Sequence, residues 1–369
     1  MITAFARRAL GGRCMKVITG VGGWPAAVPA QARAAEAAGF DCITCGELSH
    51  DSMLTMTVAA TATERIGLQT SVTIAFPRSP MVLAMEAWDL QHLSGGRFCL
   101  GLGSQVKGHN ERRFGGTWSP PAPRMREYIR MMHAVWDTWQ DGKPAEFLGK
   151  EYTYTLMTPN FNPGPIEHPR PKVGLAMVGP GMARTAGEVA DVIMPHGGIM
   201  SDKYMREVLL PAIKTGLERS GRTWSDLEIA ESGYLILGDS DSEIEQKALG
   251  MRRALSFYGS TRTYHKVLAL HGLEELGLKL HALSLRGRWD EMRDTVTVDD
   301  ILALAQTTTY DGLPEFLAEH REYATRTGLG LPRSTPEQQE RFRDVMGRVQ
   351  TLENPGVPRG LEMPLGAAS

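Results

Sequence analysis

Two glycine-containing turns carry the residue types that could hold a planar, anionic ligand. In LGLGSQVKGHNERRFG (100–115), Gly101 and Gly103 end an apolar run, and a polar, basic segment follows directly. In AMVGPG (176–181), glycines flank a proline at the start of an expected helix. Free N–H groups and the helix dipole at such a turn favour an anion. We expect the bare backbone at Gly101 and Gly103 to pass close to a flat ligand.

Titratable and aromatic side chains follow several expected strands. Glu47 and His50 come after the second strand, and histidine titrates near neutral pH, so these two residues are the candidate proton donors or acceptors. Capping of the next helix by the His50-Asp51-Ser52 turn is an equal alternative for His50. Trp24 and His196 could line a substrate, and each could equally be a packed barrel residue.

Metal and redox motifs are not expected to function here. The sequence contains no H-E-x-x-H motif, no clustered carboxylates and no His-Asp metal spacing, so we predict no metal site. Cys42 and Cys45 form a C-x-x-C within an expected strand, where residues three apart point to opposite faces. We interpret both as small buried hydrophobic residues.

Composition excludes several classes of partner. The 369 residues are 22% charged and 42% hydrophobic, with a net charge of −2, which is the balance of a globular protein. No overall field favours nucleic acid or an anionic membrane, and no apolar run is long enough to cross a bilayer. Four cysteines and the absence of a signal peptide pattern are consistent with a cytoplasmic protein that acts on a small molecule.

The elements that must position these residues alternate between strands and helices. This alternation predicts a parallel sheet, and eight such units favour a closed (β/α)8 TIM barrel of the α/β class, whose active site lies at the carboxyl ends of the strands. The expected strands span 16–21, 40–47, 66–76, 97–103, 172–178, 191–197 and 227–238, with a weaker one at 325–332.

Five segments describe the expected domain organisation. A short extension (1–14) precedes a single barrel domain (15–350), which is followed by a flexible tail (351–369). Within the barrel domain, 146–171 is an inserted hairpin and loop, and 241–322 is a polar helical region with no obvious strand.

An open doubly wound sheet is the competing architecture. Gly20, Gly22 and Gly23 follow the first strand in a partial match to the dinucleotide-binding fingerprint, and Glu47 could bind a ribose. This alternative predicts an NAD-dependent dehydrogenase.

The sequence resembles the bacterial-luciferase-like (LLM class) oxidoreductases, specifically the branch that uses the deazaflavin coenzyme F420. The order and spacing of several motifs carry the resemblance. They are TSV (70–72), SGGRFCLGLGSQ (94–105), HNERRFG (109–115), MREYIRMMHAVWDTW (125–139), EFLGKEYTYTLMTP (146–159) and KVGLAMVGPGMARTAGEVADVIM (172–194).

The resemblance implies where a cofactor would bind. A non-proline cis peptide between Ser71 and Val72 would form a bulge behind the cofactor ring in the barrel mouth. By similarity, the ring and its side chain would contact Gly103, Ser104, Gln105 and His109. The phosphate would be held by Ala176, Met177, Val178 and Gly179. The family also implies a homodimer.

The leading hypothesis is an F420-dependent oxidoreductase that transfers a hydride between the cofactor and a small organic substrate. An FMN-dependent luciferase-like monooxygenase is the first alternative, because both cofactors present a phosphate and a similar ring. A barrel that binds its cofactor without turnover is a further alternative.

Overall fold

The computed structural model describes residues 14–231, 233–354 and 356–363. The expected extension at 1–14 lies outside these residues except for Cys14, which pairs with Glu353 in a β-bridge. No helix among the described residues is both long and apolar enough to cross a bilayer.

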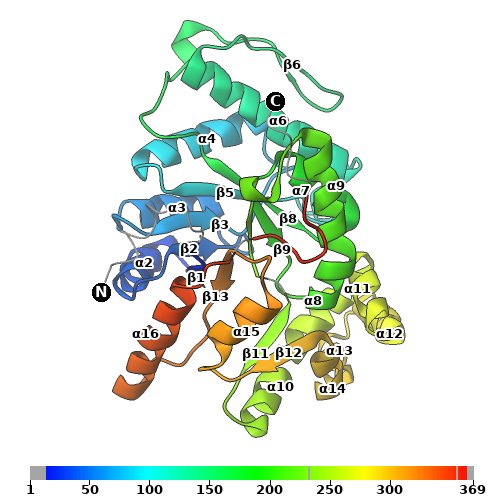
Figure 1. The fold of residues 1–369 in the computed structure, drawn as a ribbon. Helices are drawn as coiled ribbons and strands as arrows, with labels where there is room; N and C mark the ends of the chain where they lie inside the picture. The colour runs from blue at the N-terminus through cyan, green and yellow to red at the C-terminus, as the bar shows by residue number, and fades with distance from the viewer. Residues whose placement is uncertain (1–13, 232, 355, 364–369) are drawn as a thin grey trace.

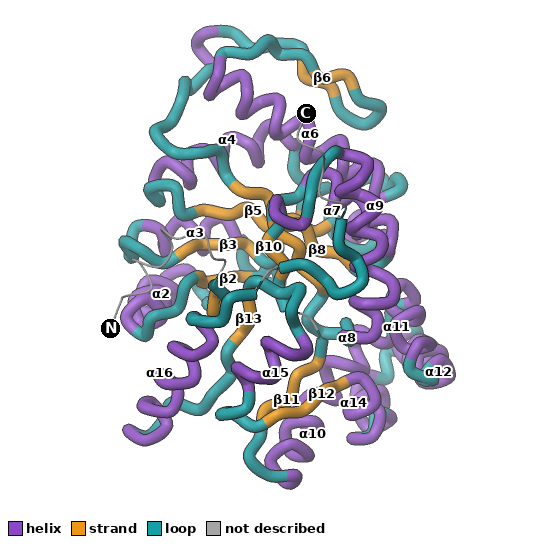
Figure 2. Tube along the Cα trace, viewed as in Figure 1, coloured by secondary structure: helices purple, strands orange, loops and turns teal. Residues whose placement is uncertain are grey.

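Eight parallel strands of the described chain form a barrel at the centre of the molecule (Figures 1 and 2). In hydrogen-bonded order they are β10 (Glu228–Ile229), β9 (Val192–Pro195), β8 (Lys172–Met177), β5 (Phe98–Gly103), β3 (Gly67–Thr70), β2 (Cys42–Cys45), β1 (Lys16–Gly20) and β13 (Arg326–Gly328). The third strand is interrupted at Ser71 and Val72 and resumes as β4 (Thr73–Ile74) beside β5.

Contacts between the first and last strands of this order close the barrel. Ala230 and Arg326 form a parallel bridge, and the Glu231 N–H donates to the Arg326 carbonyl at 2.7 Å. The TIM-barrel prediction is therefore confirmed, and the open doubly wound sheet with its NAD-binding turn is wrong. The residues Gly20, Gly22 and Gly23 follow a barrel strand instead.

Helices surround the barrel and begin where the sequence provides caps. Ser79 accepts the Val82 N–H through its hydroxyl, and Pro80 occupies the first position of the helix that follows. The helices are α2 (Val28–Ala37), α3 (Ser52–Ala60), α4 (Pro80–Leu93), α5 (Lys107–Arg112), α6 (Pro121–Asp141), α7 (Pro180–Val189), α8 (Asp202–Tyr204), the π-helix η4 (Met205–Leu209), α9 (Leu210–Ser220), α10 (Asp241–Gly259), α11 (His265–Leu270), α12 (Glu274–Ser284), α13 (Trp289–Thr295), α14 (Val298–Leu304), α15 (Leu313–His320) and α16 (Pro336–Gln350). Short 3-10 helices are η2 (Pro25–Ala27), η3 (Pro159–Phe161), η5 (Trp224–Asp226) and η6 (Arg262–Tyr264).

The expected seventh strand at 227–238 is wrong as a single element. It divides into β10 of the barrel and β11 (Tyr234–Leu237), which pairs with β12 (Ala305–Thr308) in a separate two-stranded sheet. Gly233 adopts φ +109°, a left-handed conformation that turns the chain between the two strands. The strand β12 also corrects the expectation that 241–322 holds no strand, although helices α10–α14 do fill its first part.

The insertion at 146–171 contains the antiparallel hairpin of β6 (Phe147–Leu148) and β7 (Thr153–Tyr154), as expected. This hairpin lies beyond α6 at the end of the molecule opposite to α10–α14 (Figure 1). Part of the tail expected at 351–369, residues 355 and 364–369, lies outside the described residues, and residues 352–354 and 356–363 make contacts near the amino-terminal end of the barrel. For example, the Trp224 indole donates to the Leu361 carbonyl at 2.9 Å.

The core lies between the barrel and its helices. Trp88 and Trp139 pack ring against ring at 5.7 Å, and Trp136 is fully buried beside them on α6. Cys42 and Cys45 are buried and free, as interpreted from the sequence.

Candidate functional site

The strand register places both glycine-containing turns at the same end of the barrel. Ile74 pairs with Gly103, and Leu102 pairs with Leu175 two residues before the end of β8. The two turns therefore follow neighbouring strands at the carboxyl-terminal mouth. In a TIM barrel this is the end that carries the active site.

The peptide bond between Ser71 and Val72 is cis, as the resemblance implied. Val72 and Ala176 both pack, half-buried, on a small cluster formed by Cys99, Val192 and Met194 inside the barrel. Val72 and Ala176, two of the predicted cofactor-binding residues, therefore pack on the same cluster of side chains below the barrel mouth.

Packing between strands requires glycine at positions 101 and 103, which adds a reason for these residues that is independent of a ligand. A Cβ on Gly101 would lie 1.9 Å from the Thr70 carbonyl oxygen, and one on Gly103 would lie 2.5 Å from Val72 Cγ2. The Thr70 hydroxyl also bonds to Gly101, donating to its carbonyl at 2.8 Å and accepting its N–H at 2.9 Å. Gly103 therefore makes room for the side chain that follows the cis peptide.

The turn after β5 has an unusual backbone at Gln105. Its φ is +55°, in the left-handed region that residues with a Cβ seldom adopt. Asn110, which is buried, donates to the carbonyls of Ser104 (2.9 Å) and Val106 (3.1 Å) and so fixes this conformation. Such outliers gather at ligand-binding sites, where the surroundings enforce them. The predicted His109 lies one turn further on, exposed on α5.

The turn after β8 leaves backbone donors free of side-chain caps. Gly179 is the N-cap of α7, and Pro180 occupies the first helical position. Within the part of the chain that the structure describes, no side chain accepts a hydrogen bond at this cap, and a Cβ at Gly179 would meet no atom within 4 Å. An uncapped helix start next to open space is suited to a phosphate.

Glu47 is held in an ion-pair network. Its carboxylate accepts two hydrogen bonds from Arg78, at 2.7 and 3.1 Å, and one from the Ile74 N–H at 2.7 Å. Arg78 also donates to Asp51 at 2.6 Å, and Asp51 in turn caps α3 through the Leu54 N–H. The network joins the loop after β2 to the segment after β4.

His50 lies against Trp24 at the same mouth. Their ring centroids are 4.6 Å apart, and Trp24 is 74% exposed. Because Asp51 supplies the helix cap, capping does not explain His50. Leu48 is exposed nearby, and its carbonyl accepts a hydrogen bond from Arg113 at 2.9 Å, which brings the helix after β5 next to the loop after β2.

His196 follows the carboxyl end of β9, next to the turn after β8. Its Nδ1 accepts the Gly198 N–H at 3.1 Å, and burial lowers the pKa of the imidazole. The ring is therefore neutral at physiological pH with its proton on Nε2. It packs edge-on against Tyr258 at 4.5 Å and near Tyr264 at 5.3 Å.

Sequence reasoning missed three residues of this mouth. Arg78 is part of no motif, and its partner Glu47 lies 31 residues away in the sequence. Asn110 sits in the quoted HNERRFG motif, where a buried amide beside a turn could have been suspected. Tyr258 carries no motif, and only the fold brings it to His196.

The arrangement fits a flat ring with a phosphate better than a metal. Among the described residues, no group of three or more His, Cys, Asp or Glu side chains could hold a metal ion. The mouth instead offers the Val72 surface for a ring, an uncapped helix start for an anion, and imidazoles on two sides. Those features match the requirements of a flavin-like cofactor.

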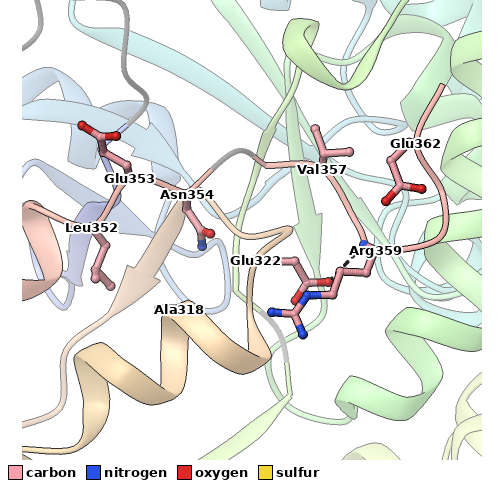
Figure 3. Close-up of a pocket in the computed structure, with 8 residues that line it drawn as sticks. All are labelled: Ala318, Glu322, Leu352, Glu353, Asn354, Val357, Arg359 and Glu362. Atoms are coloured by element: carbon pink, nitrogen blue, oxygen red, sulfur yellow. Dashed lines mark hydrogen bonds between the residues drawn. The ribbon is translucent and has the colours of Figure 1, made fainter. Parts of the chain in front are cut away.

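A cavity of about 440 Å³ lies elsewhere, between α15 and residues 352–354 and 357–362 (Figure 3). It opens at the amino-terminal end of the barrel, since Leu352 accepts the N–H of Met15 just before β1. Glu322 in this cavity accepts the Arg359 N–H and also pairs with Arg206. It is separate from the mouth.

The sequence model of the family described as luciferase-like monooxygenase matches residues 16–329 of this chain. An uncharacterized protein of Mycobacterium tuberculosis is 43% identical over 267 residues, which cover 71% of this chain and 78% of that protein. A putative coenzyme F420-dependent oxidoreductase of the same organism is 31% identical, over 61% of this chain and 67% of its own. The 5,10-methylenetetrahydromethanopterin reductase of Archaeoglobus fulgidus is 27% identical, over 77% of this chain and 83% of its own.

Solved structures share the fold. The coenzyme F420-dependent tetrahydromethanopterin reductase of Methanopyrus kandleri superposes with a TM-score of 0.69 at 19% identity, covering 91% of this chain and 97% of that one. The EDTA monooxygenase of Chelativorans superposes with a TM-score of 0.65 at 14% identity, covering 95% and 96%.

Proposed function

The chain belongs to the luciferase-like monooxygenase family, and within that family we propose that it is an oxidoreductase that exchanges a hydride between coenzyme F420 and a small organic substrate. One observation carries the proposal: the Val72 surface follows β3 and the uncapped start of α7 follows β8, and these strands flank β5 so that both features lie at one end of the barrel. The name of one relative, a putative coenzyme F420-dependent oxidoreductase, supports the choice of cofactor.

Different residues at the mouth would bind different parts of the cofactor. Val72 would support the ring from below, and Gly103 leaves the space that Val72 needs. The N–H groups at the start of α7, together with Ala176, Met177, Val178 and Gly179, would bind the phosphate. Ser71, Ser104 and Gln105 would complete the binding surface.

Basic side chains beyond β5 favour a cofactor with an extended anionic tail. Lys107, Arg112 and Arg113 are all exposed on or next to α5, and Arg113 is positioned by its bond to the Leu48 carbonyl. His109 lies on the same helix. These side chains would attract the anionic tail of F420 by charge complementarity.

When bound, the deazaflavin supplies hydride transfer without single-electron chemistry. The chain would orient the substrate above the ring and provide one acid or base. We assign that role to the imidazole of His50, which Trp24 holds at the mouth. Glu47 would then act as a positioning residue, because Arg78 and the Ile74 N–H engage its carboxylate.

A binding titration tests the cofactor. We expect reduced and oxidised F420 to quench the tryptophan fluorescence, and to bind more tightly than FMN when both are titrated into purified protein. NAD serves as a negative control because the barrel is closed. Tight binding of FMN with no response to F420 would overturn the proposal.

An FMN-dependent monooxygenase is the second candidate, favoured by the description of the family itself. It would require the reduced protein–FMN complex to consume oxygen.

We also propose that the protein is a cytoplasmic homodimer. Sedimentation of the purified protein would test the oligomeric state. A monomer would contradict that part alone.

A further inference from the structure

Aromatic rings continue outward from the candidate site along the helical region after β11. His196 contacts Tyr258 and Tyr264, with ring centroids 4.5 and 5.3 Å away. Tyr258 in turn contacts Phe257 at 5.3 Å, and Phe257 lies 6.4 Å from Trp289. We call these five residues the aromatic run.

The inner end of the aromatic run adjoins the predicted phosphate-binding turn. Met177 of this turn pairs with Pro195 across β8 and β9, and His196 is the next residue after Pro195. The outer end is open to solvent, where Phe257 is 53% and Trp289 56% exposed. The rings therefore extend from the barrel mouth to the surface of α10 and α13.

The chain fixes the inner rings in place. A Cβ on Gly198 would lie 2.4 Å from the Tyr258 ring, so only glycine permits this approach. The Tyr234 hydroxyl donates to the Gly198 carbonyl and holds the same loop. The inner rings are therefore held in place, and the exposed rings of Phe257 and Trp289 at the outer end offer apolar contact area to a ligand.

The aromatic run carries no charge at neutral pH. Burial lowers the pKa of His196, so its ring is neutral, and burial raises the pKa of Tyr264 to about 12, so its phenol stays protonated. A charge placed over the buried inner rings would lose hydration, and neither His196 nor Tyr264 would supply a counter-charge.

We propose that the aromatic run binds the apolar, uncharged body of the substrate, an alkyl chain or aryl group attached to the centre that exchanges hydride. This inference deepens the proposed function and rests on it for the location of that centre. At its inner end the Nε2–H of His196 is a neutral hydrogen-bond donor for the substrate, whereas the rings beyond it contribute apolar contact area.

Matched pairs of probes test the proposal by ligand-observed NMR on the whole chain. The probes are 2-decanone against decanoate, and acetophenone against benzoate, with 2-butanone as a short ketone. We expect each ketone to bind more tightly than its carboxylate. Affinity should rise from 2-butanone to 2-decanone, by up to about fourfold for each added methylene that is buried.

Two variants locate the binding surface. Phe257→Ser combined with Trp289→Ser changes only exposed rings and is expected to weaken 2-decanone at least fivefold. Phe161→Ser is the matched control, because Phe161 is a 79% exposed aromatic residue of η3 outside the aromatic run, and this variant should bind 2-decanone like the unaltered chain.

The outcomes separate this inference from the choice of cofactor. Ketone binding that the double variant weakens would support the aromatic run even if F420 failed to bind. Equal or tighter binding of the carboxylates, or a double variant that binds like the control, would overturn it even if F420 bound tightly.

Discussion

At the scale of single residues, the structure separates two side chains that look alike in sequence. Glu47 and His50 are three positions apart and both follow β2. Glu47 is bound by Arg78 and a backbone N–H, whereas His50 packs beside the exposed Trp24. A carboxylate with those partners stabilises the loops, and an imidazole at the mouth remains available for proton transfer.

We therefore predict that His50→Asn affects catalysis and that Glu47→Gln affects stability. The first should lower kcat by about 10²–10⁴-fold with an unchanged midpoint of unfolding. The second should lower the free energy of unfolding by about 1–3 kcal/mol, because it weakens hydrogen bonds to a charged group that is largely buried. Steady-state kinetics and urea unfolding of both variants check this. Full activity in His50→Asn, or a stable but inactive Glu47→Gln, would reverse the two roles.

At the scale of helices and strands, the sequence predicted those elements whose local residue pattern agrees with their place in the fold. Runs of apolar residues predicted the barrel strands, and Ser79 with Pro80 predicted the start of α4. The division of 227–238 was missed, because apolar residues continue on both sides of Gly233 and hide the turn there. The strand β12 was missed because its sequence AQTT is mostly polar and directly follows a helix.

The candidate site was predictable in location and less so in mechanism. Glycines, histidines and a strand ending in TSV indicated which strand ends matter. The reason for Gly103 was not predictable, since Val72 lies 31 positions earlier and meets it only across two paired strands. Long-range pairs such as Glu47 with Arg78 depend on the closed barrel and leave no local pattern.

This packing predicts a contrast between two glycines. Gly103→Ala should destabilise the protein by about 1–3 kcal/mol and weaken cofactor binding, because the new Cβ would meet Val72 at 2.5 Å. Gly179→Ala should leave unfolding of the free protein unchanged, since its Cβ would meet nothing within 4 Å. Thermal unfolding and cofactor titration of both variants measure the difference. Equal stability of the two variants would contradict the packing role of Gly103.

At the scale of the whole molecule, a buried histidine makes stability depend on pH. The Nε2 atom of His133 is buried and has no hydrogen-bond partner among the described residues, and burial lowers the pKa of the ring to about 3. The ordinary value in an unfolded chain is about 6.5, so the unfolded state binds a proton first as pH falls. The contribution of neutral His133 is thus complete above about pH 6.5 and is lost between there and about pH 3.

We predict that His133→Leu removes this part of the pH dependence. When the pH is lowered from 8 to 5, the free energy of unfolding of the variant should rise relative to that of the unaltered chain by up to about 2 kcal/mol. His92→Leu, at an exposed position on α4, is the control and should show no such gain. Urea unfolding at the two pH values provides the comparison, and parallel behaviour of the two variants would contradict the assignment.

The central claim is that one barrel mouth binds a hydride-carrying ring above Val72 and its phosphate at the start of α7. A crystal structure of the protein grown with F420 tests it most directly. We predict density for the ring beside the Ser71–Val72 peptide and for the phosphate at Gly179–Gly181. Ordered cofactor in the cavity between α15 and residues 352–354 and 357–362, or a mouth that stays empty at saturating F420, would contradict this claim.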